Sequence, residues 1–284
     1  MQRVFPSDKK KFNLEFNVAT SIPTNLKIQA YDKNKPFSFY YNTAGKVDYK
    51  GRTFDLKFPI SPDQMVIQVY PDKFGNYDEF RKYANPKERE IKITGTSIKA
   101  LKTYPMWFSQ GDLEFIKFAE WFCNNAGILS GTNFDRVPSI YKSSSGKYEI
   151  DYFNVIQNKD GSYVSTPARI GQKSGIIEVS KRDFLTYTIP GRMAILLHEY
   201  CHKYVNPKTG LKPTDEIGAD INALNIYLSL GYSPVEAHMV FLQVFKTANS
   251  DLNHKRYVML NDFIQKFLSG GLRSYYKPER AYAN

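Results

Sequence analysis

Alternating hydrophobic and polar residues mark the first hundred or so positions of the chain. Hydrophobic residues recur at every second position in four stretches, which is typical of strands buried on one face only. Turn-forming residues separate these stretches, and a further strand is expected near Glu90–Ile93. Short strands at this spacing predict an antiparallel, β-sandwich-like domain over residues 1–105. The alternating stretches are Phe12–Val18, Leu26–Ala30, Phe54–Ile60 and Met65–Val69; the turns are expected at Pro23-Thr24-Asn25, Asp32–Pro36, Ala44-Gly45, Lys50-Gly51 and Ser61-Pro62-Asp63; Tyr77–Tyr83 has helical spacing.

Hydrophobic residues at helical spacing dominate the remaining positions, 106–284. Two short strands are expected among the helices, with the polar segment Asn158–Gly175 between them as an exposed loop. The sequence therefore predicts an α+β chain in which a mainly helical domain with a small sheet follows the β-sandwich-like domain. The expected helices run from Gly111-Asp112 to Gly127, from Pro190 to Asn206-Pro207, from Thr214 to Gly231, from Pro234 to Phe245 and from Arg256 to Leu268; the expected strands are Lys147–Ile156 and Ile176–Ser180.

The sequence HEYCH, at His198–His202, is the stretch that suggests chemistry. Residues four apart on a helix lie on one face, so His198 and His202 can bind one ion together. Glu199 is rotated by about 100° around the helix and can flank the ion without ligating it. Two imidazoles beside a carboxylate are the components of zinc hydrolysis, in which the metal activates a water and the carboxylate takes its proton. The same motif also fits a buried helix whose histidines only form hydrogen bonds, so the context decides.

A second acidic pair supplies that context. Glu216 and Asp220 lie four residues apart, on one face of the next predicted helix. Glu216 can complete a His₂Glu ligand set, and Asp220 can accept a hydrogen bond from the far ring nitrogen of a ligand histidine. An exposed acidic helix face is the alternative interpretation. Asp215 points about 100° away from Glu216 and is expected to be a favourable charge at the helix N-terminus.

The pattern His198-Glu199-x-x-His202 followed by Glu216-x-x-x-Asp220 resembles the zincin metallopeptidases of the gluzincin type. The resemblance covers residues 176–231 and says nothing of the N-terminal domain. It implies that His198, His202 and Glu216 bind Zn²⁺, that Glu199 is the general base and that Asp220 supports a ligand histidine. It also implies that Ile176–Ser180 is the edge strand with which an extended peptide substrate pairs.

The chain departs from the family in two respects. The spacer between His202 and Glu216 is short compared with many gluzincins, and the group that would stabilise the oxyanion is not defined. Cys201 is expected to be a small buried hydrophobic residue, with metal ligation as the alternative. The oxyanion candidates are His238, His254, Tyr200 and Tyr187.

Charge and composition refine the expected setting. A formal charge of +11 would favour an acidic partner, but the basic residues are scattered along the chain. The aromatic residues mostly occupy the alternating positions expected in the core and are not available to stack on bases, so nucleic acid binding is not expected. Neither a signal peptide nor an apolar stretch long enough to cross a membrane is recognised. Two cysteines do not form a disulfide framework. A cytoplasmic or assembly-associated location is therefore expected.

Two functions remain in competition. The first is a zinc-dependent metallopeptidase that acts on a peptide or protein substrate, with Glu199 as general base. The second is a zincin-like structural or binding component of a larger assembly, for example a phage particle, with little or no peptidase activity. In that case the N-terminal β domain is a candidate surface for a protein partner.

Overall fold

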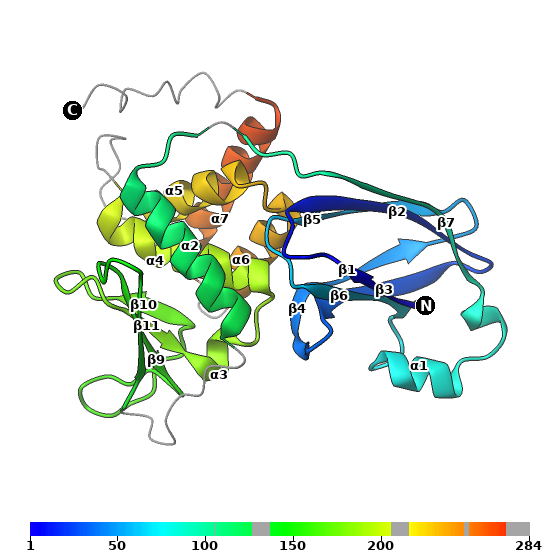
Figure 1. The fold of residues 1–284 in the computed structure, drawn as a ribbon, viewed down its shortest axis with the longest axis horizontal. Coiled ribbons are helices and arrows are strands. Elements are labelled where there is room, and N and C mark those ends of the chain that lie inside the picture. The colour runs from blue at the N-terminus through cyan, green and yellow to red at the C-terminus, as the bar shows by residue number, and fades with distance from the viewer. Residues whose placement is uncertain (105, 127–136, 206–215, 247–249, 271–284) are drawn as a thin grey trace. The chain divides into compact units, whose positions relative to one another are not determined.

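A computed structural model of the chain (Figure 1) describes residues 1–104, 106–126, 137–205, 216–246 and 250–270. The chain divides into two compact units, residues 1–102 and 103–284. The first is rich in sheet and the second is mainly helical, so the predicted α+β class is confirmed. The predicted helix boundaries at Gly127, Asn206-Pro207 and Thr214 lie outside the described residues, as does Asp215.

The first unit contains two antiparallel sheets. One has the strand order β1-β6-β3-β4 and the other has the order β5-β2-β7. Strand β2 buries every second side chain along its whole length, as the alternating sequence requires, and β3 and β5 do so over most of theirs. The bounds are β1 (Gln2–Pro6), β2 (Phe12–Thr20), β3 (Thr24–Asp32), β4 (Lys35–Val47), β5 (Arg52–Phe58), β6 (Gln64–Pro71), α1 (Tyr77–Tyr83), a 3₁₀ turn (Lys87–Arg89) and β7 (Ile91–Ala100).

Aromatic side chains connect the two sheets of this unit. Phe58 of β5 packs against Tyr40 and Tyr41 of β4, and Phe12 of β2 packs against Phe5 of β1, with ring centroids 5.2 to 6.5 Å apart. The hydroxyl of Tyr41 also donates to the carbonyl oxygen of Lys57. The inner faces of both sheets therefore share one core, as expected for a sandwich.

Two predictions for the first unit need correction. The turn expected at Ala44-Gly45 lies inside β4, where both residues pair with β3. Tertiary pairing overrides the weak β-propensity of alanine and glycine at this point. Strands β1 and β4 were not predicted, because β1 is short and mostly exposed and the buried positions of β4 do not alternate regularly. The other expected strands and the helix α1 are confirmed.

The second unit has a small mixed sheet with the order β10-β11-β9-β8. Strand β11 is parallel to β9 and antiparallel to β10. The prediction that Ile176–Ser180 is an edge strand is therefore wrong, because β11 has a neighbour on each side. The edge strands are β10 and β8, and β10 lies within the segment Asn158–Gly175 that was expected to be only a loop. The bounds are β8 (Ser139–Lys142), β9 (Glu149–Phe153), β10 (Ala168–Ile170) and β11 (Ile177–Ser180).

The helices of this unit begin where the sequence supplies capping groups. The Thr188 hydroxyl accepts from the Gly191 N–H at the start of α4. The Ser250 hydroxyl caps α7, which begins at Asp251, five residues before the expected start at Arg256. Gly191 also permits close packing, because a Cβ there would lie 2.8 Å from Cγ2 of Val240 on α6. The helix bounds are α2 (Gln110–Asn125), α3 (Lys181–Phe184), α4 (Ile189–Tyr204), α5 (Glu216–Ser229), α6 (Pro234–Lys246) and α7 (Asp251–Leu268).

The membrane and disulfide questions can be addressed for the described parts of the chain. No helix there combines the length and the apolar character needed to cross a membrane. Cys123 and Cys201 are buried free thiols, and they are not paired with each other.

Candidate metal centre

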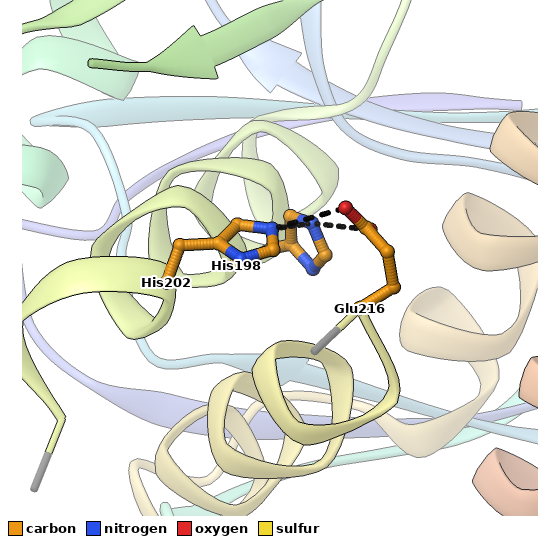
Figure 2. A group of neighbouring side chains, drawn as sticks. All are labelled: His198, His202 and Glu216. Atoms are coloured by element: carbon orange, nitrogen blue, oxygen red, sulfur yellow. Dashed lines mark hydrogen bonds and ion pairs between the residues drawn. The ribbon is translucent and has the colours of Figure 1, made fainter. Parts of the chain in front are cut away.

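Two helices bring three potential metal ligands together. His198 and His202 project from the same face of α4, and Glu216 begins α5 opposite them (Figure 2). The two Nε2 atoms lie 3.0 Å apart. Glu216 places Oε2 3.4 Å from Nε2 of His198 and Oε1 3.5 Å from Nε2 of His202. The three side chains predicted as ligands therefore converge on one point, and they form a group that could hold a metal ion.

These separations fit the donor set of a small cation. Ligands about 2.0–2.1 Å from a tetrahedral zinc ion are roughly 3.3 Å from one another. The three observed separations lie within a few tenths of an ångström of that value. Two imidazole nitrogens and a carboxylate oxygen are also among the donor sets of catalytic zinc sites. The residues present thus fit the cofactor that the motif implies.

Asp220 lies on the far side of the His198 ring from this group. Its Oδ1 is 2.8 Å from Nδ1 of His198, and the aspartate side chain is only 1% exposed. A carboxylate at Nδ1 favours a proton on that nitrogen, so that Nε2 is the nitrogen through which the ring would bind a metal ion. This is the position that was expected for Asp220.

Arg256 is the site residue that the sequence did not reveal. Projecting from α7, it contacts Asp220 through Nε and Nη2, and Nη2 also lies 3.1 Å from Oε2 of Glu216. The signal available in the sequence was only an arginine near the start of a predicted helix. Its distance of 36 residues from Asp220 gave no indication of contact.

The electrostatic environment shifts the pKa values of Glu216 and Glu199 in opposite directions. Hydrogen bonding to His198 holds the pKa of Glu216 down at about 2, although partial burial opposes this shift. For His198, burial lowers the pKa, but hydrogen bonds to Asp220 and Glu216 outweigh burial and raise it to about 10. Glu216 is thus held as the anion that a cation requires.

Glu199 has a different environment from Glu216. Its side chain is buried, and burial raises its pKa above the ordinary value, while His198 and His202 act in the opposite direction. The backbone N–H of Ile170 on β10 hydrogen-bonds to the carboxylate and also favours the charged form. Glu199 therefore lies between the ligand group and the edge strand.

A cavity of about 540 Å³ opens over these residues. Strand β10 and its preceding residues line one side, and helices α4, α5, α6 and α7 line the rest. The apolar part of its lining includes Ala194, Ile195, Val240 and Phe241, while the polar part includes the ligand group, Glu199 and Arg256. The cavity therefore combines a polar centre with an apolar wall, as small-molecule and peptide sites commonly do.

The structure does not bring the four oxyanion candidates into this cavity. The Tyr200 hydroxyl donates to Oδ1 of Asp112 at 2.6 Å, on the side of α4 that packs against α2. Tyr187 is buried outside the cavity lining. His238 packs against Tyr257 with ring centroids 5.5 Å apart, and His254 is exposed on α7.

Cys201 is also absent from the cavity lining. It is completely buried, and burial raises the pKa of its thiol well above the ordinary value. A thiol in such surroundings is a small hydrophobic residue, as expected, and is poorly suited to give the thiolate that zinc requires.

Comparisons with protein-family models, with curated proteins and with solved structures gave no match for this chain. The interpretation of the site therefore depends on its residues and their geometry.

Proposed function

We propose that this chain is a zinc-dependent peptidase. The observation that carries the proposal is the convergence of His198, His202 and Glu216 beside a buried carboxylate, Glu199, in an open cavity. A structural metal site closes all positions around its ion with protein ligands, whereas a catalytic site provides three and leaves one open. Three converging ligands that face a cavity favour the catalytic type.

His198, His202 and Glu216 would hold the ion in this proposal. When bound, zinc lowers the pKa of a water in its open position toward roughly 7 and polarises the substrate carbonyl. Glu199 would accept a proton from the attacking water and pass it to the leaving amine. Glu199 is buried and lines the cavity beside the ligand group, which is the position that this proton transfer requires.

The cavity also suggests how a substrate is held. Strand β10 pairs with β11 on one edge, and no other described strand covers its second edge. An extended peptide can add to such an edge through backbone hydrogen bonds. A side chain of that peptide would then lie against the apolar wall formed by Ile195, Val240 and Phe241. The proposed substrate is therefore an extended peptide with an apolar residue next to the cleaved bond.

Incubation of a peptide library with the zinc-loaded protein tests this function, with mass spectrometry to detect cleavage. The wild type should cleave, and Glu199→Gln should bind one zinc ion but lose cleavage by a factor of roughly 10² or more. Glu149→Gln on β9, where Glu149 pairs with Lys142, is the matched control and should cleave as the wild type does.

The result also decides between the two functions. Cleavage by Glu199→Gln at the wild-type rate would contradict the mechanism. A wild type that binds zinc but cleaves nothing in a broad library would instead favour a structural or binding component of a larger assembly.

A further inference from the structure

Arg256 makes contact with both carboxylates of α5 that belong to the site. Its Nε lies 2.6 Å from Oδ2 of Asp220, and its Nη2 lies 3.0 Å from Oδ1. The same Nη2 is 3.1 Å from Oε2 of Glu216. The arginine side chain is only 11% exposed and that of Asp220 only 1%, so the contact between these two is shielded from water.

The contact with Asp220 has the geometry of a two-pronged fork. Parallel N–H···O bonds between a guanidinium and a carboxylate fix the plane and direction of the carboxylate, which a point charge cannot do. Asp220 uses Oδ1 both for this fork and for Nδ1 of His198. Its orientation therefore determines which nitrogen of His198 carries the proton.

The contact of Arg256 with Glu216 reduces the repulsion between the two carboxylates of α5. Glu216 and Asp220 are one helical turn apart, and two carboxylates at this spacing repel each other in a partly buried site. A cation between them removes that repulsion. It also restricts the long side chain of Glu216, which is 42% exposed.

We propose that Arg256 is a positioning residue, which holds Glu216 and Asp220 in the arrangement that binds the metal. This inference rests on the proposed zinc centre and extends it with a residue that acts through the ligands. Arg256 is not assigned to the reacting atoms. A simple ion pair between α5 and α7 is the competing explanation, in which Arg256 contributes to the stability of the fold but not to the affinity for metal.

The charge of Arg256 and its positioning of the ligands have opposite effects on zinc affinity, which makes the proposal testable. Removal of Arg256 takes a positive charge away from a cation site, and this effect alone would strengthen zinc binding. Loss of position weakens zinc binding, and outer residues that orient metal ligands typically contribute roughly 10- to 100-fold in affinity. Weaker binding therefore cannot come from the change in charge.

The experiment measures zinc affinity by competition with a chromophoric chelator and the visible spectrum of the Co²⁺-substituted protein. Three variants are compared with the wild type: Arg256→Ala, Arg256→Lys, and the control Lys266→Ala. The control removes a positive charge from α7 that pairs with Asp262, an exposed residue remote from the ligands. Free guanidinium, added below denaturing concentrations, tests whether the missing group can be restored.

The proposal expects Arg256→Ala to bind zinc roughly 10- to 100-fold more weakly, with an altered Co²⁺ spectrum that guanidinium partly restores. Arg256→Lys keeps the positive charge but lacks the fork, so it should still bind zinc more weakly. Lys266→Ala should match the wild type. Wild-type affinity and spectrum in Arg256→Lys, or tighter binding in Arg256→Ala, would overturn the proposal.

These readouts separate the two proposals. A wild type that binds zinc without cleaving peptides contradicts the peptidase function, and the affinities still decide the role of Arg256. A wild type that binds no zinc overturns both.

Discussion

Nδ1 of His198 lies 2.8 Å from Oδ1 of Asp220, while Nε2 of the same ring faces His202 and Glu216. One imidazole thus connects a buried carboxylate to the ligand group. Asp220→Asn should weaken zinc binding by roughly 10- to 100-fold, because the neutral amide supports the required tautomer less well. Chelator competition measures this change.

The matched control for this prediction is Asp262→Asn on α7, where the carboxylate is exposed and pairs with Lys266. It should bind zinc with wild-type affinity. Equal affinities for Asp220→Asn and the wild type would show that the contact with His198 does not orient the ligand.

Tyr200→Phe tests whether this residue is structural. Its hydroxyl is buried and donates to Asp112, which also caps α2 through Ser109, so its loss leaves a carboxylate oxygen short of a donor. We expect a loss of about 1–3 kcal/mol in the free energy of unfolding, measured by urea titration. Zinc affinity and peptide cleavage per folded molecule should not change. A large fall in cleavage without any loss of stability would instead place Tyr200 in the reaction.

Glu236 gives a prediction about pH. Its carboxyl group on α6 accepts from the Thr188 hydroxyl, and burial raises its pKa from an ordinary value near 4.5 to about 7. The folded state therefore holds this proton more tightly than the unfolded state, so stability falls as the pH rises through about 7. Glu236→Gln removes this loss, and its stability advantage over the wild type should grow by about 2 kcal/mol between about pH 5 and about pH 8.

Urea titrations of both proteins at the two pH values measure this difference. A difference that stays constant with pH would contradict a buried, titrating carboxyl group at this position.

Val240→Ala tests the apolar wall of the cavity. Val240 is buried on α6 and lies on the cavity lining, so its truncation enlarges the apolar space. A peptide library should show a preference that shifts by about tenfold toward a bulkier apolar residue next to the cleaved bond. Val235→Ala, an exposed change on the same helix, should leave the profile unchanged. An identical profile for Val240→Ala would remove this wall from the substrate site.

Local patterns were sufficient to predict most of the elements. Phe12–Val18 alternates because one face of β2 is buried, and the helical spacing of Tyr77–Tyr83 corresponds to α1. The three-residue strand β10 was missed, because Ala168–Ile170 is too short to show a period and follows a polar segment. With β10 unrecognised, the edge of the small sheet was assigned to β11.

The site could be predicted where the chemistry follows helical spacing. His198 and His202 share a face by their separation of four residues, and Glu216 and Asp220 do so for the same reason. Arg256 could not be found in this way, because only the packing of α7 on α5 brings it to the carboxylates. Tyr200 should have been excluded, since two residues after His198 a helix has turned by about 200°.

X-ray absorption at the zinc edge tests the central claim most directly, namely that His198, His202 and Glu216 hold one zinc ion with an open position. We predict one zinc per chain, two imidazole nitrogens and oxygen donors at roughly 2.0–2.1 Å, and one oxygen that a small hydroxamate replaces. The imidazole signal should fall by half in His202→Ala. A sulfur ligand at about 2.3 Å, or a first shell unchanged by His202→Ala, would contradict the account.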